Sequence, residues 1–293
     1  MKLINGKAVA EEIKNSLKQD VLSYTQKHKR PPHLAAVLVG SKPASLAYVG
    51  NKVKSCEQVG FKSTLVKLNE DVTEAQLLAE IKKLNEDPDV DGFIVQLPLP
   101  AHIDEVKVML AIDHKKDVDG FHPINFGRMA QGLPCYLPAT PYGIVLLLER
   151  YNIQVAGAHV VVVGRSNIVG TPLSILLSRK SPLGDATVTL THSRTKELSK
   201  ITNTADIIIA AIGIPNFITE DMVRNNVVII DVGINRVESD NQNTKAKLVG
   251  DVDFDAVAEK CSHITPVPGG VGPMTVVALL LNTFKAANKE IYG

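Results

Sequence analysis

The stretch VVVVGRSNIVGTP, residues 160–172, decides the fold of the second half of the chain. Its four valines form a continuous apolar run, which is typical of a strand buried on both faces of a parallel sheet. Gly164 and Gly170 then flank a short turn that leads into a helix. A strand, a glycine turn and a helix in this order present backbone N–H groups and the positive end of a helix dipole, which together suit a pyrophosphate.

The glycine turn departs from the complete dinucleotide fingerprint. Ser166 stands where the G-x-G-x-x-G pattern has its second glycine. A partial motif of this kind is equally consistent with a dinucleotide-binding turn and with a plain strand-to-helix turn that binds nothing. Three more apolar segments follow, ATVTLTH (186–192), ADIIIAAIG (205–213) and NVVIIDVGI (226–234). Their short connections predict a Rossmann-type parallel sheet, the architecture of a nucleotide-binding domain.

The first half of the chain repeats the alternation of strands and helices that is typical of an α/β fold. Val9, Ile13, Leu17 and Val21 recur at four-residue spacing and predict one buried face of an opening helix. The elements predicted after it are a buried strand at 33–40, a helix at 43–60, an alternating strand at 61–68, a helix opened by a Thr73/Gln76 capping box, and a buried strand within 90–100.

A segment rich in glycine, proline and polar residues, 113–143, separates the two halves, and Thr140 and Pro141 are expected to cap and begin a fresh helix after it. The last predicted helix, about 274–289, is expected to return to the first domain. We therefore predict a two-domain α/β protein. Residues 1–139 with 274–293 form an N-terminal catalytic domain, and residues 140–273 form the Rossmann-type dinucleotide-binding domain.

Composition narrows the class of ligand. The 32 Lys and Arg residues nearly balance the 31 Asp and Glu residues, so no global field favours a nucleic acid or an anionic membrane as partner. Cys56, Cys135 and Cys261 are scattered and lack metal-ligand spacing, which fits a reducing compartment and gives no sign of a metal. With no signal peptide and no apolar run near 20 residues, the sequence predicts a cytoplasmic protein that acts on small molecules.

The residues after the strand ATVTLTH bear on the choice of cofactor. An NAD site usually has Asp or Glu there to hold the ribose hydroxyls, whereas this chain has Ser193 and Arg194. Together with Arg165 in the glycine turn, they offer two guanidinium groups and a hydroxyl to a 2'-phosphate. This pattern favours NADP, although exposed arginines are common and each alone is equally well explained as a solvated surface charge.

Tyr48 and Lys52 lie one helical turn apart and therefore share a face of the predicted helix. Their Y-x-x-x-K spacing matches the catalytic couple of short-chain dehydrogenases, but in those enzymes the pair follows the cofactor glycines, whereas here it precedes Gly164. A solvated helix face is the simpler interpretation of such a pair taken alone.

Polar residues after the last strand of the first half weaken that interpretation. Gln96 ends an apolar strand, at the edge where α/β sheets bind ligands, and Asp117 and Asp119 lie in the loop that follows. Asp117 is equally suited to capping a turn, and His122, which precedes a proline, is assigned a structural role.

These residues belong to a set of strings in the order seen in one enzyme family. YVGNK, QLPLP, KDVDGFHPIN, TPYGI, VVVVGRSNIVGTP, THSRT, DVGINR, GDVDF and TPVPGGVGPMT together span nearly the whole chain. The sequence thus resembles the bifunctional methylene-tetrahydrofolate dehydrogenase/methenyl-tetrahydrofolate cyclohydrolases of one-carbon metabolism.

The resemblance implies one active site, in the cleft between the two domains, for two reactions. A hydride passes from methylene-tetrahydrofolate to NADP, and water then opens the methenyl product to formyl-tetrahydrofolate. The resemblance also implies a homodimer. A cysteine that is common in the family is replaced by Ala139 in LPATP, and we expect no loss of catalysis from this difference.

The resemblance assigns roles to individual residues. Lys52 is the main catalytic group of the hydrolytic step, Gln96 holds and tunes it, Asp119 binds the pterin, and Tyr48 lines the folate site. The implied folate-binding set is Tyr48, Val49, Lys52, Val95, Gln96, Leu97, Asp119, Pro268, Gly269, Gly270, Val271 and Gly272. The implied cofactor-binding set is Gly164, Arg165, Ser166, Ser193, Arg194 and Ile234.

Two other functions compete with this one. The first is a monofunctional NAD-dependent methylene-tetrahydrofolate dehydrogenase, against which stand Lys52 and the lack of an acidic residue after ATVTLTH. The second is a nucleotide-binding regulatory protein without catalysis. The complete set of Tyr48, Lys52, Gln96 and Asp119 argues against it.

Overall fold

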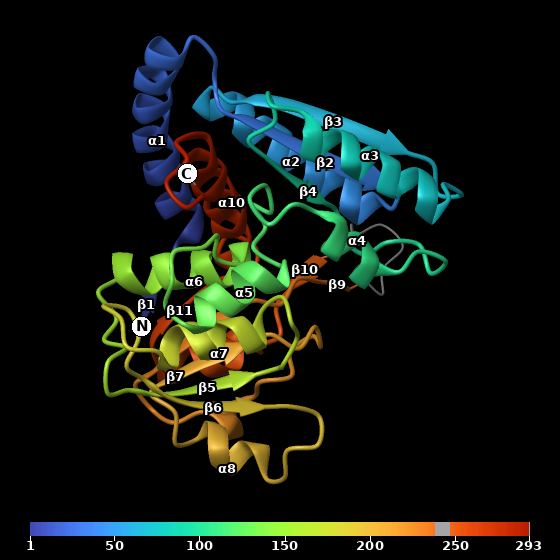
Figure 1. Cartoon of the computed structure of the whole chain (residues 1–293). Coiled ribbons are helices and arrows are strands. Elements are labelled where there is room, and N and C mark those ends of the chain that lie inside the picture. Colours follow the sequence, from blue (N-terminus) through green and yellow to red (C-terminus); the bar gives the residue numbers. More distant parts are fainter. Residues whose placement is uncertain (238–246, 293) are drawn as a thin grey trace. The chain divides into compact units, whose positions relative to one another are not determined.

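The chain forms two compact units in a computed structural model that describes residues 1–237 and 247–292 (Figure 1). One unit comprises Glu11–Ala139 and Val276–Gly293, and we call it the three-stranded unit after its sheet. The other comprises Met1–Ala10 and Thr140–Thr275, and we call it the six-stranded unit. The two-domain α/β fold predicted from the sequence is confirmed.

The sheet of the three-stranded unit is parallel, with strand order β3-β2-β4. Its strands are β2 (His33–Val39), β3 (Lys62–Leu68) and β4 (Gly92–Val95), and β2 and β4 are buried along their whole length. Helix α2 (Pro43–Val59) leads from β2 to β3 on one side, and α3 (Glu74–Glu86) leads back to β4 on the other. The strand order therefore reverses between β2 and β4, and ligands of such sheets bind beyond the carboxyl ends of the strands at this point.

The helix signals read from the sequence have the predicted geometry in this unit. Gly60 ends α2 in the left-handed conformation, at φ 86°, where a side chain would be strained. Thr73 and Gln76 form the predicted capping box at the start of α3. The other helices that contribute to the unit are α1 (Gly6–His28), α4 (Glu105–Ala111), α5 (Pro123–Ala130) and α10 (Val271–Ala287).

Helices α1 and α10 lie side by side and close one face of the sheet (Figure 1). Leu17 and Val21 of α1 and Leu279 and Leu280 of α10 belong to the same buried core cluster as Leu34 and Leu38 of β2. The Tyr24 hydroxyl donates a 3.2 Å hydrogen bond to the carbonyl of Ala287, which joins the two helices near the C-terminus. Helices α1 and α10, which are far apart in sequence, thus contribute to the same hydrophobic core.

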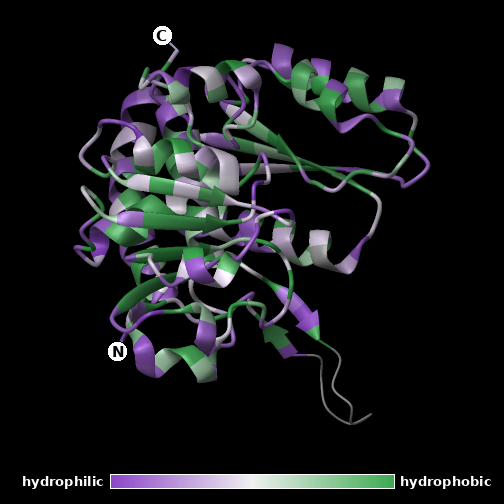
Figure 2. Cartoon of the chain, turned by 90° about the horizontal axis from the view of Figure 1, so that it is seen from below, coloured by the Kyte–Doolittle hydropathy of each residue, from purple (hydrophilic) through white to green (hydrophobic). Residues whose placement is uncertain are grey.

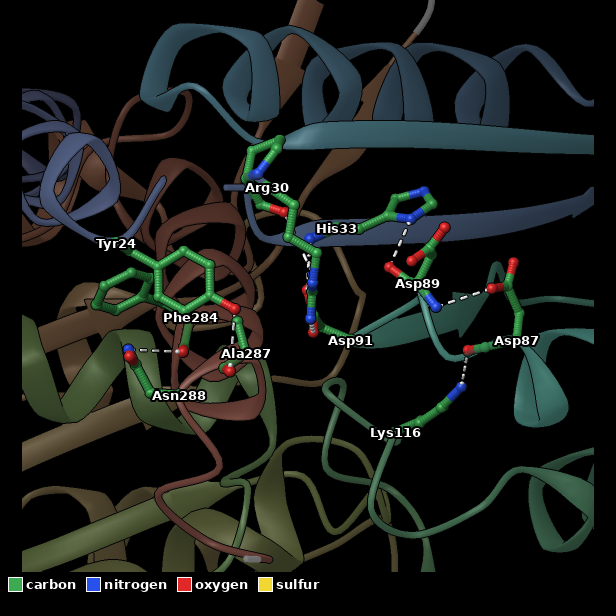
Figure 3. Close-up of polar contacts among 11 residues, drawn as sticks. Tyr24, Arg30, His33, Asp87, Asp89, Asp91, Lys116, Phe284, Ala287 and Asn288 are labelled. Carbon is green, nitrogen blue, oxygen red and sulfur yellow. Dashed lines mark hydrogen bonds and ion pairs between the residues drawn. The ribbon is translucent and has the colours of Figure 1, made fainter. Parts of the chain in front are cut away.

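A carboxylate anchors the start of β2 in Figure 3. Asp91 accepts hydrogen bonds from both terminal nitrogens of Arg30, at 2.8 and 2.7 Å, and from the backbone N–H of His33 at 2.8 Å. The His33 ring lies within 2.9 Å of the Asp89 carbonyl and 2.8 Å of the Thr64 hydroxyl. Burial lowers the pKa of His33, so the ring is a neutral link between strands.

The six-stranded unit has a parallel sheet with strand order β1-β11-β8-β7-β5-β6. The strands are β1 (Lys2–Leu3), β5 (His159–Val163), β6 (Thr187–Thr191), β7 (Ile207–Ala210), β8 (Val227–Asp231) and β11 (Cys261–Ile264). The order reverses between β5 and β7, which is the Rossmann-type arrangement predicted from the valine run. In Figure 2 the strands are mainly hydrophobic, whereas the helices carry residues of both kinds.

The remaining elements of this unit connect or extend its sheet. Helix α6 (Ala139–Arg150) enters the unit, and α7 (Gly170–Ser178), α8 (Leu198–Thr202) and α9 (Phe254–Val257) connect strands, with short 3-10 turns at Glu220–Met222 and Ala258–Lys260. Strands β9 (Asn235–Val237) and β10 (Lys247–Val249) form a separate antiparallel pair. None of the described helices combines the length and the apolar character needed to traverse a lipid bilayer.

The compact units and the expected domains divide the first ten residues differently. Residues 1–139 were assigned to one domain, but Met1–Ala10 belong to the six-stranded unit. The reason is backbone pairing: β1 adds to the edge of that sheet beside β11, and the N–H of Ile4 donates to the carbonyl of Ile264 at 2.8 Å. The return of the last helix to the first domain begins at Val276.

Two predicted helix starts were also displaced. Helix α6 begins at Ala139, one residue before the predicted cap Thr140, and α10 begins at Val271, three residues before Met274. The polar segment 113–143 contains a helix that the sequence analysis did not expect, α5, which begins at Pro123 and is capped by the His122 ring. All three cysteines are buried, and none of them forms a disulfide.

Asp91→Asn should destabilise the chain by about 2 kcal/mol, because the substitution leaves Arg30 and the His33 amide competing for one remaining acceptor oxygen. The free energy of unfolding in urea measures the effect. Glu86→Gln is the matched control, since Glu86 pairs with Lys82 on an exposed helix face and should change stability by less than about 0.5 kcal/mol. Equal effects of the two substitutions would contradict the role of Asp91.

Candidate active site

Lys52 is a buried lysine, with 5% of its surface exposed, on a helix that otherwise has an ordinary apolar face. Its neighbours one turn away along α2 are Tyr48, which is partly buried, and Cys56, which is fully buried. Burial raises the pKa of the Cys56 thiol to about 12, so Cys56 is a neutral neighbour. The solvated helix face that was the simpler interpretation of the Tyr48/Lys52 pair is therefore wrong.

The amine of Lys52 is held by two side chains. Nζ donates a 3.3 Å hydrogen bond to Oε1 of Gln96, and it lies 4.5 Å from the ring centroid of Tyr48. Nε2 of Gln96 donates at 2.7 Å to the carbonyl of Leu97, which leaves only Oε1 to face the lysine. The Gln96 amide is thus oriented by its own backbone to accept a hydrogen bond from Lys52.

Asp119 is the charged partner of this lysine. Burial lowers the pKa of Lys52, and the negative charge of Asp119 opposes that shift. Conversely, burial raises the pKa of Asp119, and the positive charge of Lys52 opposes it. Each group therefore sets the protonation of the other. The lowered pKa brings the release of a proton from Lys52 closer to neutral pH than for an exposed lysine.

Asp117 and His122 shape the loop that carries Asp119. The Asp117 carboxylate accepts hydrogen bonds from the N–H groups of Gly120 and His122, at 3.1 and 2.8 Å, and from the Asn125 amide at 2.9 Å. Burial raises its pKa to about 7. The structural roles expected for both residues are confirmed: Asp117 caps the turn, and the His122 ring caps α5.

Other residues of the predicted folate-binding set lie outside this cluster. Val49 and Val95 are buried in separate core clusters, and Leu97 is partly buried against the second of these. The segment Pro268–Gly272 belongs to the six-stranded unit. There, Gly269 accepts a 2.9 Å hydrogen bond from the N–H of Lys7, and a side chain on Gly6 would collide with the carbonyl of Gly270.

In the glycine turn of the six-stranded unit, the main chain passes very close to neighbouring main-chain segments. Gly164 has φ 115°, and a Cβ atom there would lie 2.1 Å from the carbonyl oxygen of Ala211. A Cβ on Gly170, at the start of α7, would lie 1.9 Å from the carbonyl oxygen of Gly164. Both positions therefore require glycine, because a side chain at either would collide with the main chain.

The residues between these glycines suit a dinucleotide phosphate. Arg165 and Ser166 are exposed at the carboxyl end of β5, beside the start of a nine-residue helix. The Ser166 hydroxyl accepts from the N–H of Val169 at 3.2 Å, and its carbonyl accepts from the N–H of Thr171 at 3.0 Å. The fixed turn, its cation and the helix dipole fit an anionic cofactor.

Ser193 and Arg194 follow the neighbouring strand at the same level. Val163 of β5 is opposite Thr191 of β6, and the N–H of Gly164 donates to the carbonyl of Thr191 at 3.1 Å. Both side chains are exposed on a turn closed by two hydrogen bonds between His192 and Thr195. The N–H of Thr195 donates to the carbonyl of His192 at 2.8 Å, and the N–H of His192 donates to the Thr195 hydroxyl at 2.9 Å. The structure thus places Arg165, Ser193 and Arg194 along one edge of adjacent strands.

Two buried carboxylates that the sequence analysis did not single out organise the same end of this sheet. Asp231 accepts from the N–H groups of Gly233, Asp251 and Val252, at 2.9 to 3.1 Å. Asp251 accepts from the N–H groups of Ile212 and Gly213, at 2.7 and 2.9 Å, and from the Asn235 amide. Burial raises the pKa of Asp231 to about 6.

These carboxylates fix the loop that carries Ile234, which is 57% exposed. The residues on either side of Ile234, Gly233 and Asn235, are both held by the pair. Ile234 also lies near Gly272, whose added Cβ would be 3.5 Å from its Cδ1 atom. The sequence did carry a signal for Asp231: the apolar strand VVII ends in an aspartate, which is followed by Val232 and Gly233.

Comparison with known families gives two matches that together cover nearly the whole chain. Residues 4–119 match the tetrahydrofolate dehydrogenase/cyclohydrolase catalytic domain. Residues 138–291 match the tetrahydrofolate dehydrogenase/cyclohydrolase NAD(P)-binding domain. The residues around Lys52 fall within the first match, and the glycine turn falls within the second.

Individual proteins agree with these matches. The bifunctional protein FolD of Flavobacterium johnsoniae is 60% identical over 287 residues, which cover 98% of this chain and 97% of that protein. The crystal structure of the bifunctional methylenetetrahydrofolate dehydrogenase/cyclohydrolase of Campylobacter jejuni is 48% identical, with a TM-score of 0.93 and 99% coverage of both chains. The Trypanosoma brucei enzyme, solved with NADP cofactor and an inhibitor, is 35% identical with a TM-score of 0.93, over 99% of this chain and 98% of that one.

Gly164→Ala should destabilise the chain by about 3 kcal/mol or more, because the added Cβ would meet the Ala211 carbonyl in addition to the strained φ. Gly157→Ala is the matched control: its φ is 78°, but open space surrounds the position, so only the strain of about 1 kcal/mol remains. Thermal unfolding of the two variants separates these effects. Equal losses would mean that the contact with Ala211 is relieved at no cost.

Proposed function

Because the chain belongs to the tetrahydrofolate dehydrogenase/cyclohydrolase family, we propose that it oxidises methylene-tetrahydrofolate with NADP and then hydrolyses the methenyl product, with Lys52 as the proton-transfer group. The observation that carries the proposal is the buried amine of Lys52, hydrogen-bonded to Gln96 and electrostatically coupled to Asp119. A structural lysine would have no reason to be withdrawn from water in this way.

The hydrolytic step requires protons to move in both directions. Addition of water to the methenyl cation releases a proton. Cleavage of the carbon–nitrogen bond then removes the proton of the new hydroxyl group as the carbonyl forms and returns one to the departing nitrogen, so that one proton is released overall. Lys52 Nζ serves as base and then as acid, because its lowered pKa makes the neutral amine more accessible than in an exposed lysine. Gln96 keeps the amine directed, and Tyr48 shields one side of it.

The oxidative step requires positioning more than acid-base catalysis. A bound NADP would supply the acceptor for the hydride of the methylene carbon. Gly164, Arg165 and Ser166 would hold its phosphates, with Ile234 as a further contact. Asp119 binds the pterin, and the segment Pro268–Gly272 contributes to folate binding. These assignments rest on the family resemblance together with the exposed turn and the coupled carboxylate described above.

The choice of NADP over NAD is assigned to the edge formed by β5 and β6. Arg165, Ser193 and Arg194 present two cations and a hydroxyl there, and the turn after β6 lacks the acidic residue that an NAD site uses. No observation favours the alternative of a monofunctional NAD-dependent dehydrogenase. A regulatory nucleotide-binding protein without catalysis would have no use for the Lys52 cluster.

The same resemblance supports three further proposals. The three-stranded unit is the catalytic, folate-binding domain, and the six-stranded unit is the NADP-binding domain. The protein acts in the cytoplasm as a homodimer. Its products enter the one-carbon metabolism that supplies purine, methionine and histidine biosynthesis.

The proposal as a whole is tested by adding methylene-tetrahydrofolate with each cofactor and following NADPH and the methenyl intermediate together. Formation of NADPH followed by decay of the methenyl absorbance supports both activities. Accumulation of the intermediate without decay would contradict the cyclohydrolase assignment, and faster reduction of NAD than of NADP would contradict the assignment of cofactor.

Lys52→Ala should lower the cyclohydrolase rate by at least about 100-fold, since the variant lacks the amine that moves both protons. It should still fold and bind NADP, because the cofactor turn lies in the other compact unit. Lys54→Ala, an exposed lysine of the same helix, serves as control and should retain the rate. Undiminished ring opening in the Lys52 variant would refute its role.

Arg165→Ala should weaken NADP binding by about tenfold and NAD binding by no more than about twofold, because a charge-assisted hydrogen bond to the 2'-phosphate is lost. Isothermal titration with both cofactors measures this. Arg150→Ala, at the exposed end of α6, controls for a general loss of positive charge. Equal weakening of both cofactors would show that Arg165 does not read the 2'-phosphate.

A further inference from the structure

Asn282 is a buried polar residue of helix α10 in apolar surroundings. Asn282 follows the run VVALLL, residues 276–281, and is fully buried at 0% exposure. Its Nδ2 donates two hydrogen bonds, at 2.9 Å to the carbonyl of Val118 and at 2.8 Å to the carbonyl of Leu137. Its Oδ1 receives no hydrogen bond within the part of the chain that the structure describes.

The half-satisfied amide is informative because it lowers stability. A buried acceptor without a donor is unfavourable, and a leucine, which has the same branching and no polar atoms, would carry no such penalty. The donating end, in contrast, meets two carbonyls that lie 19 residues apart in sequence (137 − 118 = 19). Asn282 thus has the properties of a clamp for two loop segments rather than of an ordinary core residue.

The clamped segments are those that fix the main chain at Asp119. Val118 immediately precedes Asp119, and the carbonyl of Asp119 accepts a 3.2 Å hydrogen bond from the N–H of Ala139. A Cβ atom on Gly120 would lie 2.5 Å from the backbone of Leu137, so the segments touch with no room for a side chain. Each peptide group next to Asp119 is therefore held, and α10 holds both segments.

We propose that Asn282 is a positioning residue: by clamping the segments of Val118 and Leu137, it sets the place of the Asp119 carboxylate relative to the Lys52 amine. The inference deepens the proposed function and rests on it. Asn282 acts through the main chain and touches neither Lys52 nor any reacting group. All the residues concerned lie within the three-stranded unit.

The consequence is a specific pH effect. The groups that face the Lys52 amine are Asp119, the neutral Cys56 thiol, the Tyr48 ring and the uncharged Gln96 amide. Of these, Asp119 is the carboxylate that raises the pKa of Lys52 against the effect of burial. If Asp119 is displaced, the pKa of Lys52 falls, and the limb of the cyclohydrolase pH profile that reports Lys52 moves to lower pH.

The test compares Asn282→Leu with Asn288→Ala in the full-length protein. Leucine has the branched shape of asparagine but donates no hydrogen bond, whereas Asn288, just after α10, is exposed and donates at 3.1 Å to the carbonyl of Phe284. We expect Asn282→Leu to reduce the cyclohydrolase kcat/KM by about tenfold and to shift its pH profile to lower pH. The dissociation constant for NADP should change by less than about twofold, and Asn288→Ala should change neither quantity.

A double-mutant cycle with Asp119→Asn distinguishes positioning from general support of the fold. If Asn282 acts through Asp119, Asn282→Leu should reduce kcat/KM by less than about twofold in the Asp119→Asn background and leave its pH profile in place. Asn282→Ser keeps one donor in a smaller side chain and provides a second variant where leucine disrupts packing. It should give a smaller shift in the same direction.

The inference is overturned if Asn282→Leu or Asn282→Ser lowers the melting temperature but leaves the pH profile and kcat/KM unchanged. The same conclusion follows if the loss of rate is as large in the Asp119→Asn background as in the wild-type protein. Failure of the proposed function would look different, because the unmodified protein would then lack cyclohydrolase activity altogether.

Discussion

Withdrawal of one amine from water is the constraint on which the three-stranded unit depends. Lys52 is unfavourable in a buried site, and its neighbours provide what water would otherwise supply: an acceptor from Gln96, an aromatic face from Tyr48 and a countercharge from Asp119. These three come from α2, the end of β4 and the loop beyond it. The fold must therefore hold three separate segments in place around one nitrogen atom, and the buried strand β2 pairs with β4, which precedes Gln96.

Both units apply the same geometric rule to different chemistry. In each parallel sheet the strand order reverses once, and the polar residues follow the carboxyl ends of the strands at that reversal. Gln96 follows β4 in one unit, and Gly164 follows β5 in the other. The proposed proton-transfer group and the proposed phosphate-binding turn thus arise from one architecture, and the loops rather than the strands determine which chemistry each unit would support.

The sequence was sufficient for the features that depend on local pattern. Continuous apolar runs predicted β2, β4, β5, β7 and β8, and the capping box predicted α3. It failed where a contact joins distant segments without a local signature. The pairing of Lys2 with His263 moved the first ten residues to the other unit, and the two hydrogen bonds of Asn282 cross 164 and 145 residues. The residue spacing alone predicted an exposed Lys52. Its burial is explained only by the neighbouring end of strand β4.

The two aspartates of the six-stranded unit also constrain how this chain can be recombined with its relatives. Each aspartate fills the space that a glycine beside the other leaves open: a Cβ on Gly233 would strike the Asp251 carboxylate, and one on Gly250 would strike that of Asp231. The segments 231–233 and 250–251 are thus complementary in shape, and each requires the other. A chimaeric protein whose two parent sequences join between these segments keeps its fold only if both parents have the same reciprocal arrangement of aspartate and glycine.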